Sequence, residues 1–254
     1  MPVGFVVLTV TARDEGGNAN PATVACCVPS ANPGNSTNFL FQPETINAYE
    51  GGYKAAFFGR EVTLSSSAFY YDYHNMQTTV FDPIAQRAIV NVPRAQIYGA
   101  ELEGSWQIDG LLLRGGGAYT HSRVSQQLDL VDAGAPLAGP QNVTGRQLPY
   151  APAWTGNAAA SYTVQSPIGS WILAAQYSYT SRTYASLFQV VPRDLLGSHS
   201  LVNANLALKL KDGIRLEGYV TNLGNVLYAA GTLGDDAAFW GPPRQFGMRV
   251  RYEY

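Results

Sequence analysis

The clearest pattern in the chain is a two-residue alternation of apolar and polar side chains, which is sharpest at the C-terminus. One series there is Phe246, Met248, Val250, Tyr252 and Tyr254, and the other is Gln245, Gly247, Arg249, Arg251 and Glu253. Successive side chains of a strand point to opposite faces. Residues 243–254 are therefore predicted to form a strand with one apolar, aromatic face and one charged face.

The same alternation recurs along the chain from residue 44 onwards. We expect strands at 44–58, 62–77, 95–106, 111–122, 154–164, 171–183, 201–210 and 214–222, before the C-terminal strand. A further strand over 5–11 would bring the total to about ten. Tight turns are expected near residues 59, 109, 167 and 212, and long loops around residues 85, 137, 191 and 232. Short turns at one end and long loops at the other are typical of outer-membrane barrels.

The predicted fold is therefore all-β, a segment of an antiparallel transmembrane β-barrel with about nine or ten strands joined by alternating short turns and long loops. Lipid would contact the apolar series of each strand, and the charged series would face the lumen. The predicted lumen-facing charges are Glu101, Glu103, Arg114, Arg249 and Arg251. The apolar C-terminal series, Phe246, Met248, Val250, Tyr252 and Tyr254, is the expected signal for membrane insertion.

Composition agrees with a sheet that has one face in lipid and one in water. Charged residues make up 13% of the chain, against roughly 25% in ordinary soluble domains. Aromatic residues reach 12%, and 16 of them are tyrosines. The net charge of −2 gives no basic surface, so nucleic acid is not an expected partner. The uncharged stretch 147–181 is interrupted by Pro149, Pro152 and Pro167, which argues against a membrane-spanning helix.

The first 43 residues carry the weakest pattern and are expected to hold one strand and a long extracellular-type loop. No basic segment and no small-residue cleavage site marks a secretory signal peptide at the N-terminus. We therefore expect the chain to be the C-terminal part of a longer protein. The adjacent Cys26 and Cys27 are read as incidental loop residues, because a bond between neighbouring cysteines strains the backbone.

Catalytic and metal-binding patterns are missing from the sequence. His74, His121 and His199 lie far apart and share no ligand spacing, and no G-x-S-x-G motif is present. Glu101 and Glu103 share a strand face and could pair as an acid/base couple. A lumen wall in which Arg114 balances them across the 109–110 turn is the preferred interpretation. We expect no enzymatic activity, no metal and no cofactor.

Aromatic side chains at the loop side are the candidates for ligand contact. These candidates are Tyr71, Tyr73, His74, Tyr184, Phe188, Phe239 and Trp240. Rings at these places could stack on a bound ligand. The alternative is that they belong to the aromatic girdles that barrels place at the two membrane interfaces.

Several stretches, taken in order, resemble the C-terminal part of the barrel of TonB-dependent outer-membrane receptors. They are PETINAYEGGYK (43–54), FYYDY (69–73), IYGAELEGSW (97–106), LPYAPAW (148–154), YVTNLGNVLY (219–228) and GPPRQFGMRVRYEY (241–254). The resemblance covers about residues 43–254. It rests on the order and spacing of the set, since each stretch alone is weak.

The resemblance implies a place in the outer membrane of a Gram-negative bacterium. Receptors of this family are barrels of about 22 strands with a plugged lumen, and they take up a scarce ligand such as an iron–siderophore complex. Residues 44–254 would be the last strands of such a barrel, without the plug. The implied partners are outer-membrane lipid, the missing N-terminal barrel and plug, and a small-molecule ligand such as a siderophore. The TonB complex would be reached only through the missing plug.

Two other classes remain open from the sequence. One is a small self-contained, porin-like channel, since about ten strands could close on themselves. The other is a soluble β-sandwich protein, in which the apolar series would be packed inside.

Overall fold

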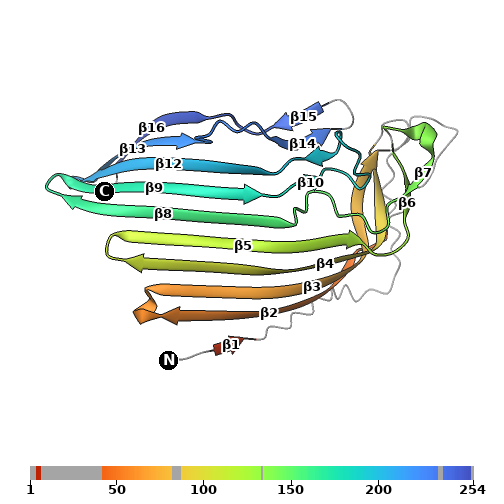
Figure 1. Cartoon of the computed structure of the whole chain (residues 1–254), viewed down its shortest axis with the longest axis horizontal. Coiled ribbons are helices and arrows are strands. Elements are labelled where there is room, and N and C mark those ends of the chain that lie inside the picture. The colour runs from red at the N-terminus through yellow and green to blue at the C-terminus, as the bar shows by residue number, and fades with distance from the viewer. Residues whose placement is uncertain (1–3, 7–41, 82–86, 133, 234–236, 253–254) are drawn as a thin grey trace.

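The main feature is one antiparallel sheet of ten strands, in which each strand pairs with its neighbours in the order β1-β2-β3-β4-β5-β8-β9-β12-β13-β16 (Figure 1). This computed structural model describes residues 4–6, 42–81, 87–132, 134–233 and 237–252. The strands of the sheet are β1 Gly4–Val6, β2 Thr45–Phe57, β3 Val62–Phe81, β4 Arg87–Ile108, β5 Leu111–Val124, β8 Trp154–Ser166, β9 Gly169–Thr180, β12 His199–Leu210, β13 Ile214–Thr221 and β16 Gln245–Tyr252.

The predicted all-β fold is confirmed, as are the tight turns at one end of the sheet and loops at the other (Figure 1). We call these the turn end and the loop end. Three loops, 125–153, 181–198 and 222–244, hold three short strand pairs. These are β6 Asp129–Val131 with β7 Pro140–Asn142, β10 Thr183–Tyr184 with β11 Leu195–Leu196, and β14 Ala229–Leu233 with β15 Ala237–Trp240.

In the described part of the chain the helical segments are two short 3₁₀ turns, η1 Phe58–Arg60 and η2 Pro136–Ala138. Within the ranges given above, no helix has the length and apolar character needed to cross a membrane. Of the strand expected over 5–11, Phe5 and Val6 lie in β1, which pairs with β2, and residues 7–11 lie outside the described residues. Cys26, Cys27 and Tyr254 lie outside the described residues.

One predicted loop is wrong. Residues 78–93 were expected to connect two strands, but β3 runs to Phe81 and β4 begins at Arg87, with these two residues paired. The β-branched Thr78, Val80 and Ile89 favour strand here. Pro93 lies inside β4, opposite Asn75, which takes a left-handed backbone conformation with φ of 51°.

The Asp109-Gly110 turn shows why a glycine is needed at the turn end. Asp109 has a φ of 47°, as the tight hairpin predicted from the sequence requires. The carbonyl of Gly110 accepts a hydrogen bond of 2.8 Å from the amide of Thr163 in β8. A Cβ atom on Gly110 would lie 2.3 Å from the Thr163 carbonyl oxygen, so any side chain would push the strands apart.

The register places all the predicted apolar series on one face of the sheet. Directly paired residues share a face, and one such row runs Leu173, Leu206, Gly218, Met248 across four strands. We call this the apolar face and the other the polar face. Leu206 is 48% exposed and Met248 is 88% exposed. A β-sandwich would bury such a face, so the described part of the chain is not a sandwich packed on its apolar side.

Aromatic rings mark both borders of the apolar face. Towards the loop end, the rings of Tyr98 and His121 stack with centroids 4.7 Å apart, and Tyr119 contacts Trp154 at the same distance. Trp106 lies at the turn end of β4. From Tyr98 to Trp106 β4 runs through about nine residues, the ~9–11 that a tilted strand needs to cross a bilayer. We call the zone between these borders the apolar belt.

Charged side chains return to this face only beyond the belt. Arg94 binds Asp72 with both Nε and Nη2 at 2.7 Å, and both residues lie on the loop side of Tyr70 and Tyr98. Inside the belt, the apolar-face positions of the nine strands from β2 to β16 carry no Lys, Arg, Asp or Glu. The change from apolar to charged side chains therefore follows the ring border.

Because the two faces differ, substitution by arginine at adjacent residues of β8 should change the folding free energy by very different amounts. Ala158 lies in the apolar belt opposite Tyr177, whereas Asn157 lies on the polar face opposite Ser178. In a lipid bilayer, Ala158→Arg should destabilise the folded protein by roughly 2–4 kcal/mol, because an arginine near the midplane loses its hydration. Denaturant titration of the protein in lipid vesicles measures this free energy.

The matched control is Asn157→Arg, which places the same side chain one position away on the polar face. We expect a change within about 1 kcal/mol, as for an exposed site. Equal costs for the two substitutions would show that the faces do not meet different solvents.

Candidate ligand-binding surface at the loop end

Two loops fold onto the polar face at the loop end and close a small hydrophobic cluster there. The 125–153 loop supplies Val143 and Leu148, and the 181–198 loop supplies Leu187. They pack against Ala95 of β4 and Val124 of β5, which are paired across the two strands. Removal of these side chains from water holds the loops against the strand ends.

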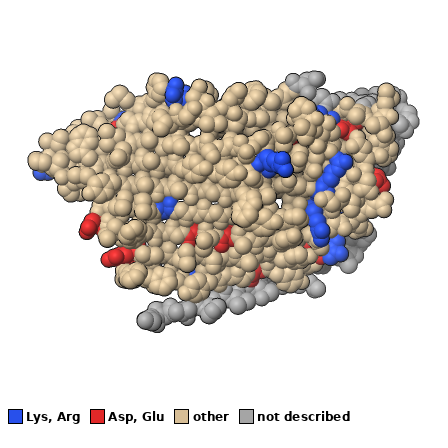
Figure 2. Space-filling model, in the orientation of Figure 1, with Lys and Arg blue, Asp and Glu red and all other residues tan. Residues whose placement is uncertain are grey.

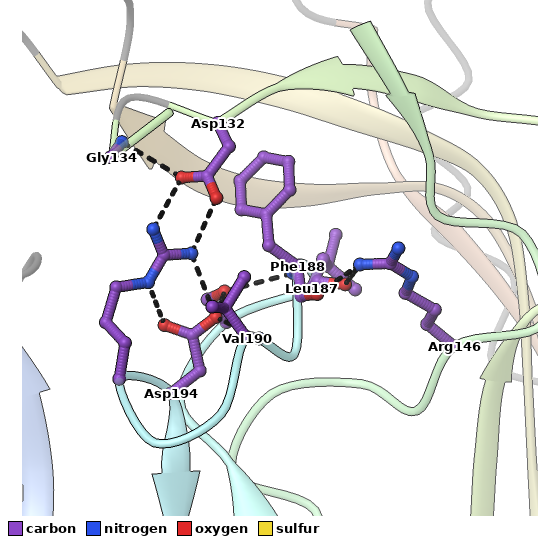
Figure 3. Close-up of polar contacts among 9 residues, drawn as sticks. Asp132, Gly134, Arg146, Leu187, Phe188, Val190 and Asp194 are labelled. Carbon is purple, nitrogen blue, oxygen red and sulfur yellow. Dashed lines mark hydrogen bonds and ion pairs between the residues drawn. The ribbon is translucent and has the colours of Figure 1, made fainter. Parts of the chain in front are cut away.

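A buried ion cluster joins the same two loops (Figure 3). Arg193 of the second loop binds Asp132 of the first through Nη1 at 3.0 Å and Nη2 at 2.7 Å. Its Nε atom donates to Asp194 at 2.8 Å. The Arg193 side chain is 14% exposed and both carboxylates are 5% exposed. A guanidinium shared by two carboxylates in fixed geometry orients all three groups.

Further hydrogen bonds make Asp194 the organising residue of the second loop. Its carboxylate accepts a 2.8 Å bond from the Ser186 hydroxyl and a 2.9 Å bond from the backbone amide of Val190. Burial acts to raise the pKa of Asp194, but the bonds from Arg193 and Ser186 outweigh it, so this pKa lies below its usual range. Asp194 is therefore ionised at neutral pH and holds the loop closed.

Arg146 adds a second link between the loops (Figure 3). Its Nη1 atom donates to the carbonyl oxygens of Leu187, at 3.2 Å, and Phe188. The side-chain amide of Gln189 donates to the carbonyl of Gln147 at 3.1 Å. These contacts, the ion cluster and the hydrophobic cluster make one packed unit of the two loops.

Basic side chains gather at the loop end of the sheet. Figure 2 shows a band of Lys and Arg where the strands of the sheet meet the loops, while few charges lie over the middle of the sheet. Arg94, Arg123, Arg146 and Arg193 all belong to this end of the chain's strands and loops.

The third loop, 222–244, is fixed by the side chain of Asn222, which is almost fully buried. Its Nδ2 atom donates to the carbonyls of Val226, at 2.9 Å, and Pro242, at 3.0 Å. Its Oδ1 atom accepts from the amide of Val226 at 2.8 Å. Asn222 also takes the left-handed conformation, with φ of 48°, which asparagine adopts more readily than most residues. One side chain thus ties the end of β13 to the segment that leads into β16.

The structure separates the three candidates from β3. Tyr71 and Tyr73 lie on the polar face, where Tyr71 donates to Glu50 and Tyr73 packs against the hydrophobic cluster. His74 lies on the opposite face, and its Nε2 atom is 3.3 Å from Asp72. The two tyrosines thus share the polar face, and His74 does not join them.

The remaining aromatic candidates lie in the loops. Phe188 packs against the same hydrophobic cluster as Tyr73. Tyr184 is in β10, and its carbonyl accepts a 2.8 Å bond from the amide of Tyr150. Phe239 and Trp240 on β15 are 56% and 60% exposed. Phe188 therefore contributes to the packing of the hydrophobic cluster, while the side chains of Phe239 and Trp240 are open to solvent.

The predicted lumen charges all lie on the polar face. Arg114 pairs directly with Ser105, so its side chain starts one row away from Glu103, and no ion pair joins it to Glu101 or Glu103 within the described ranges. The expected balance by contact is thus not formed. At the other edge of the sheet, an Arg249 guanidinium nitrogen lies 3.8 Å from Glu217, and its Cζ lies 5.4 Å from the Tyr219 ring centroid.

Arg251 also lies on this face, paired with Arg215, while Phe246, Met248, Val250 and Tyr252 of β16 lie on the apolar face. Among the described residues no three His, Cys, Asp or Glu side chains are placed to hold a metal ion. The sequence reasoning missed the ion cluster around Arg193 and the role of Asn222. Neither has a local signal, because the partners come together only through the loops.

The family match now decides the identity of the fold. The family described as "TonB dependent receptor-like, beta-barrel" matches residues 11–223. The chain belongs to the TonB-dependent receptor β-barrel family. The resemblance read from the sequence is confirmed. This family consists of transport receptors.

Solved receptor structures share this barrel wall. The siderophore receptor PiuA from Acinetobacter baumannii superposes with a TM-score of 0.69 at 19% identity, over 87% of this chain and 30% of PiuA. The ferric yersiniabactin uptake receptor FyuA from Yersinia pestis gives 0.67 at 18% identity, over 83% of this chain and 30% of FyuA. At such identities the likeness shows the fold, and the chain spans about 30% of each receptor's length. No curated protein sequence matches the chain.

Arg193→Ala should free the two loops of the receptor segment from each other. It leaves Asp132 and Asp194 buried without their cation, which typically costs 3–5 kcal/mol, although part of this is relieved if the loops open to water. Amide hydrogen exchange of residues 185–196 should then accelerate by more than about tenfold.

Arg123→Ala is the control, because Arg123 is exposed and, among the residues the structure describes, its side chain hydrogen-bonds Gln96, at 2.8 Å, and no residue of the 181–198 loop. Exchange in residues 185–196 should not change in that variant. Unaltered exchange in Arg193→Ala would show that the cluster does not hold the loops.

Proposed function

We propose that the chain forms part of the wall of an outer-membrane receptor that takes up a scarce ligand such as an iron–siderophore complex. The observation that carries the proposal is the apolar belt, an exposed apolar surface bounded by aromatic rings and backed by a polar face. Water would not tolerate so large an exposed apolar surface on a soluble monomer. Hydrocarbon on that side and water on the other explain both faces.

The sheet edges favour a barrel larger than the described strands. β1 and β16 lie at opposite ends of the strand order and do not pair with each other in the part of the chain that the structure describes. An unpaired edge in hydrocarbon leaves backbone groups without partners, at several kcal/mol each. We infer that further strands of the same receptor complete the barrel, and that a plug within it reaches the TonB complex.

Ligand capture is assigned to the loop end. The loops there are packed into a preformed unit, and preformed sites lose less entropy on binding. Tyr71, Tyr73, Phe239 and Trp240 offer rings near this end, two of them on the polar face and two on the third loop. The related structures include the ferric-catecholate import receptor Fiu of Escherichia coli K12, with a TM-score of 0.60 at 16% identity over 88% of this chain and 30% of Fiu. An iron chelate is the ligand class proposed here.

The orientation is tested by epitope tags on intact bacteria. A tag inserted after Leu137, a fully exposed side chain of the first loop, should bind antibody on intact cells. A tag inserted after Asp212, in the turn between β12 and β13, should bind only after the outer membrane is permeabilised. Both tagged proteins should fractionate with the outer membrane.

Recovery in the soluble fraction, or tags with the reverse accessibility, would contradict the membrane assignment. Transport is measured in the same cells by uptake of radioactive iron supplied as different siderophore complexes. Deletion of the gene should abolish uptake of at least one complex, and uptake that is unchanged for all of them would refute the iron-chelate assignment.

A further inference from the structure

We propose that a cationic patch on the apolar face, just beyond the loop-side border of the apolar belt, binds the phosphate group of an anionic membrane lipid. The patch consists of Arg94 and Gln96 of β4 and Arg123 of β5, with the hydroxyl of Tyr70 beside them. These residues lie on the face that the proposed function turns towards lipid, so the inference rests on that function. It adds a preferred headgroup to a surface that otherwise requires only hydrocarbon.

The register places the patch directly outside the ring border. Gln96 and Arg123 are paired and form the first row beyond Tyr98, and Arg94 lies one row further out. At a rise of ~3.3 Å per residue and a strand tilt of about 45°, these rows lie roughly 5 Å and 9 Å beyond Tyr98. A bilayer has an interfacial layer of about 5–8 Å on each side of its hydrocarbon core. The row of Arg123 therefore lies at the depth of lipid headgroups.

Hydrogen bonds fix the patch and leave donors available. Arg123 donates through Nε, at 3.2 Å, and Nη2, at 2.8 Å, to Oε1 of Gln96. The Nε2 atom of Gln96 donates to the hydroxyl of Tyr70 at 3.0 Å, so the proton of that hydroxyl is available to an acceptor. A guanidinium has five N–H groups, and the remaining ones of Arg123 make no hydrogen bond with the described residues. The patch thus offers both N–H and O–H groups to a ligand.

The carboxylate beside the patch is covered by its own partners. Both oxygens of Asp72 accept 2.7 Å bonds from Arg94, one from Nε and one from Nη2. The Nε2 atom of His74 lies 3.3 Å from the same carboxylate. The side chain of Asp72 is 12% exposed, whereas that of Arg94 is 43% exposed and Arg123 is exposed as well. The charge presented to the surroundings is therefore positive.

This arrangement favours a phosphate monoester. Arg94 and Arg123 are diagonal neighbours on adjacent strands, with backbones about 7–8 Å apart, so their long side chains can reach one anion between them. Arginine binds carboxylate and phosphate through parallel pairs of hydrogen bonds. A phosphate monoester has three acceptor oxygens and a charge of about −1.5 to −2. It can accept from both guanidiniums and from Tyr70 together, whereas a carboxylate has only two oxygens.

The apolar surface next to the patch suits the acyl chains of the same lipid. Tyr98 and Leu102 follow Gln96 along the apolar face of β4 and are 38% and 53% exposed. Removal of this surface from water by acyl chains is favourable and adds to the bonds made by the phosphate. A free phosphate ion would gain nothing from it. We therefore assign the patch to a lipid and not to a soluble anion.

The test measures binding of phosphatidic acid, whose headgroup is a phosphate monoester, to the full chain extracted from outer membranes in detergent. Native mass spectrometry during a titration gives the dissociation constant of the first bound lipid. Diacylglycerol with the same acyl chains should bind more than about tenfold more weakly, because it lacks the charged acceptor. Arg123→Gln should weaken binding of phosphatidic acid about tenfold. Arg123→Lys, which keeps the charge, should weaken it less.

Arg114→Gln is the matched control, because Arg114 is an exposed arginine of the same strand that lies on the polar face. It should bind phosphatidic acid like the unmodified protein. Equal weakening in Arg114→Gln and Arg123→Gln, or equal binding of the two lipids, would overturn the site. Displacement of the bound lipid by an equal concentration of inorganic phosphate would overturn the choice of a lipid. The epitope-tag experiment decides the membrane assignment separately, so failure of the patch leaves that result intact.

Discussion

The structure depends on one requirement: in hydrocarbon, the backbone N–H and C=O groups of each strand must hydrogen-bond to neighbouring strands. This requirement is met by pairing each strand with its neighbours from β2 to β16, and the apolar–polar alternation and the tight turns set the register. Because the side-chain period of a strand is two, one register error would carry a whole apolar series to the polar face. The aligned row of Leu173, Leu206 and Met248 shows that the register holds across the last strands. The lipid contact proposed for one face and the aqueous interior proposed for the other both depend on this register.

The loop end is stabilised by different interactions. On the loop side of Tyr98, the interactions are those that stabilise soluble proteins. They are a small hydrophobic cluster around Val124, a buried ion cluster at Arg193 and the hydrogen bonds of Asn222 in the third loop. These interactions order the loops without any help from lipid. The strands therefore supply a rigid frame, and the loops supply the ordered surfaces to which we assign ligand capture under the proposed function.

The features that could be predicted from the sequence are those set by neighbouring residues, namely the strands, their two faces and the tight turns. The two-residue alternation identified the faces of residues such as Leu206 and Arg249, and Asp109-Gly110 identified its turn. The alternation could not show contacts between distant loops: Arg193 and Asp132 are 61 residues apart, and the rings of His199 and Tyr228 stack only because Gly241 leaves room for Tyr228. The ends of β3 and β4 were misjudged, although the β-branched Thr78, Val80 and Ile89 there favour strand.

Measurement of the solvent on each side of β12 tests the central claim most directly. Nitroxide labels placed singly at residues 202 to 206 in lipid bilayers report collisions with membrane-dissolved oxygen or with an aqueous nickel complex. Labels at Val202, Ala204 and Leu206 should favour oxygen, and labels at Asn203 and Asn205 should favour nickel. Equal accessibility to nickel at all five positions would contradict the assignment of lipid to the apolar face.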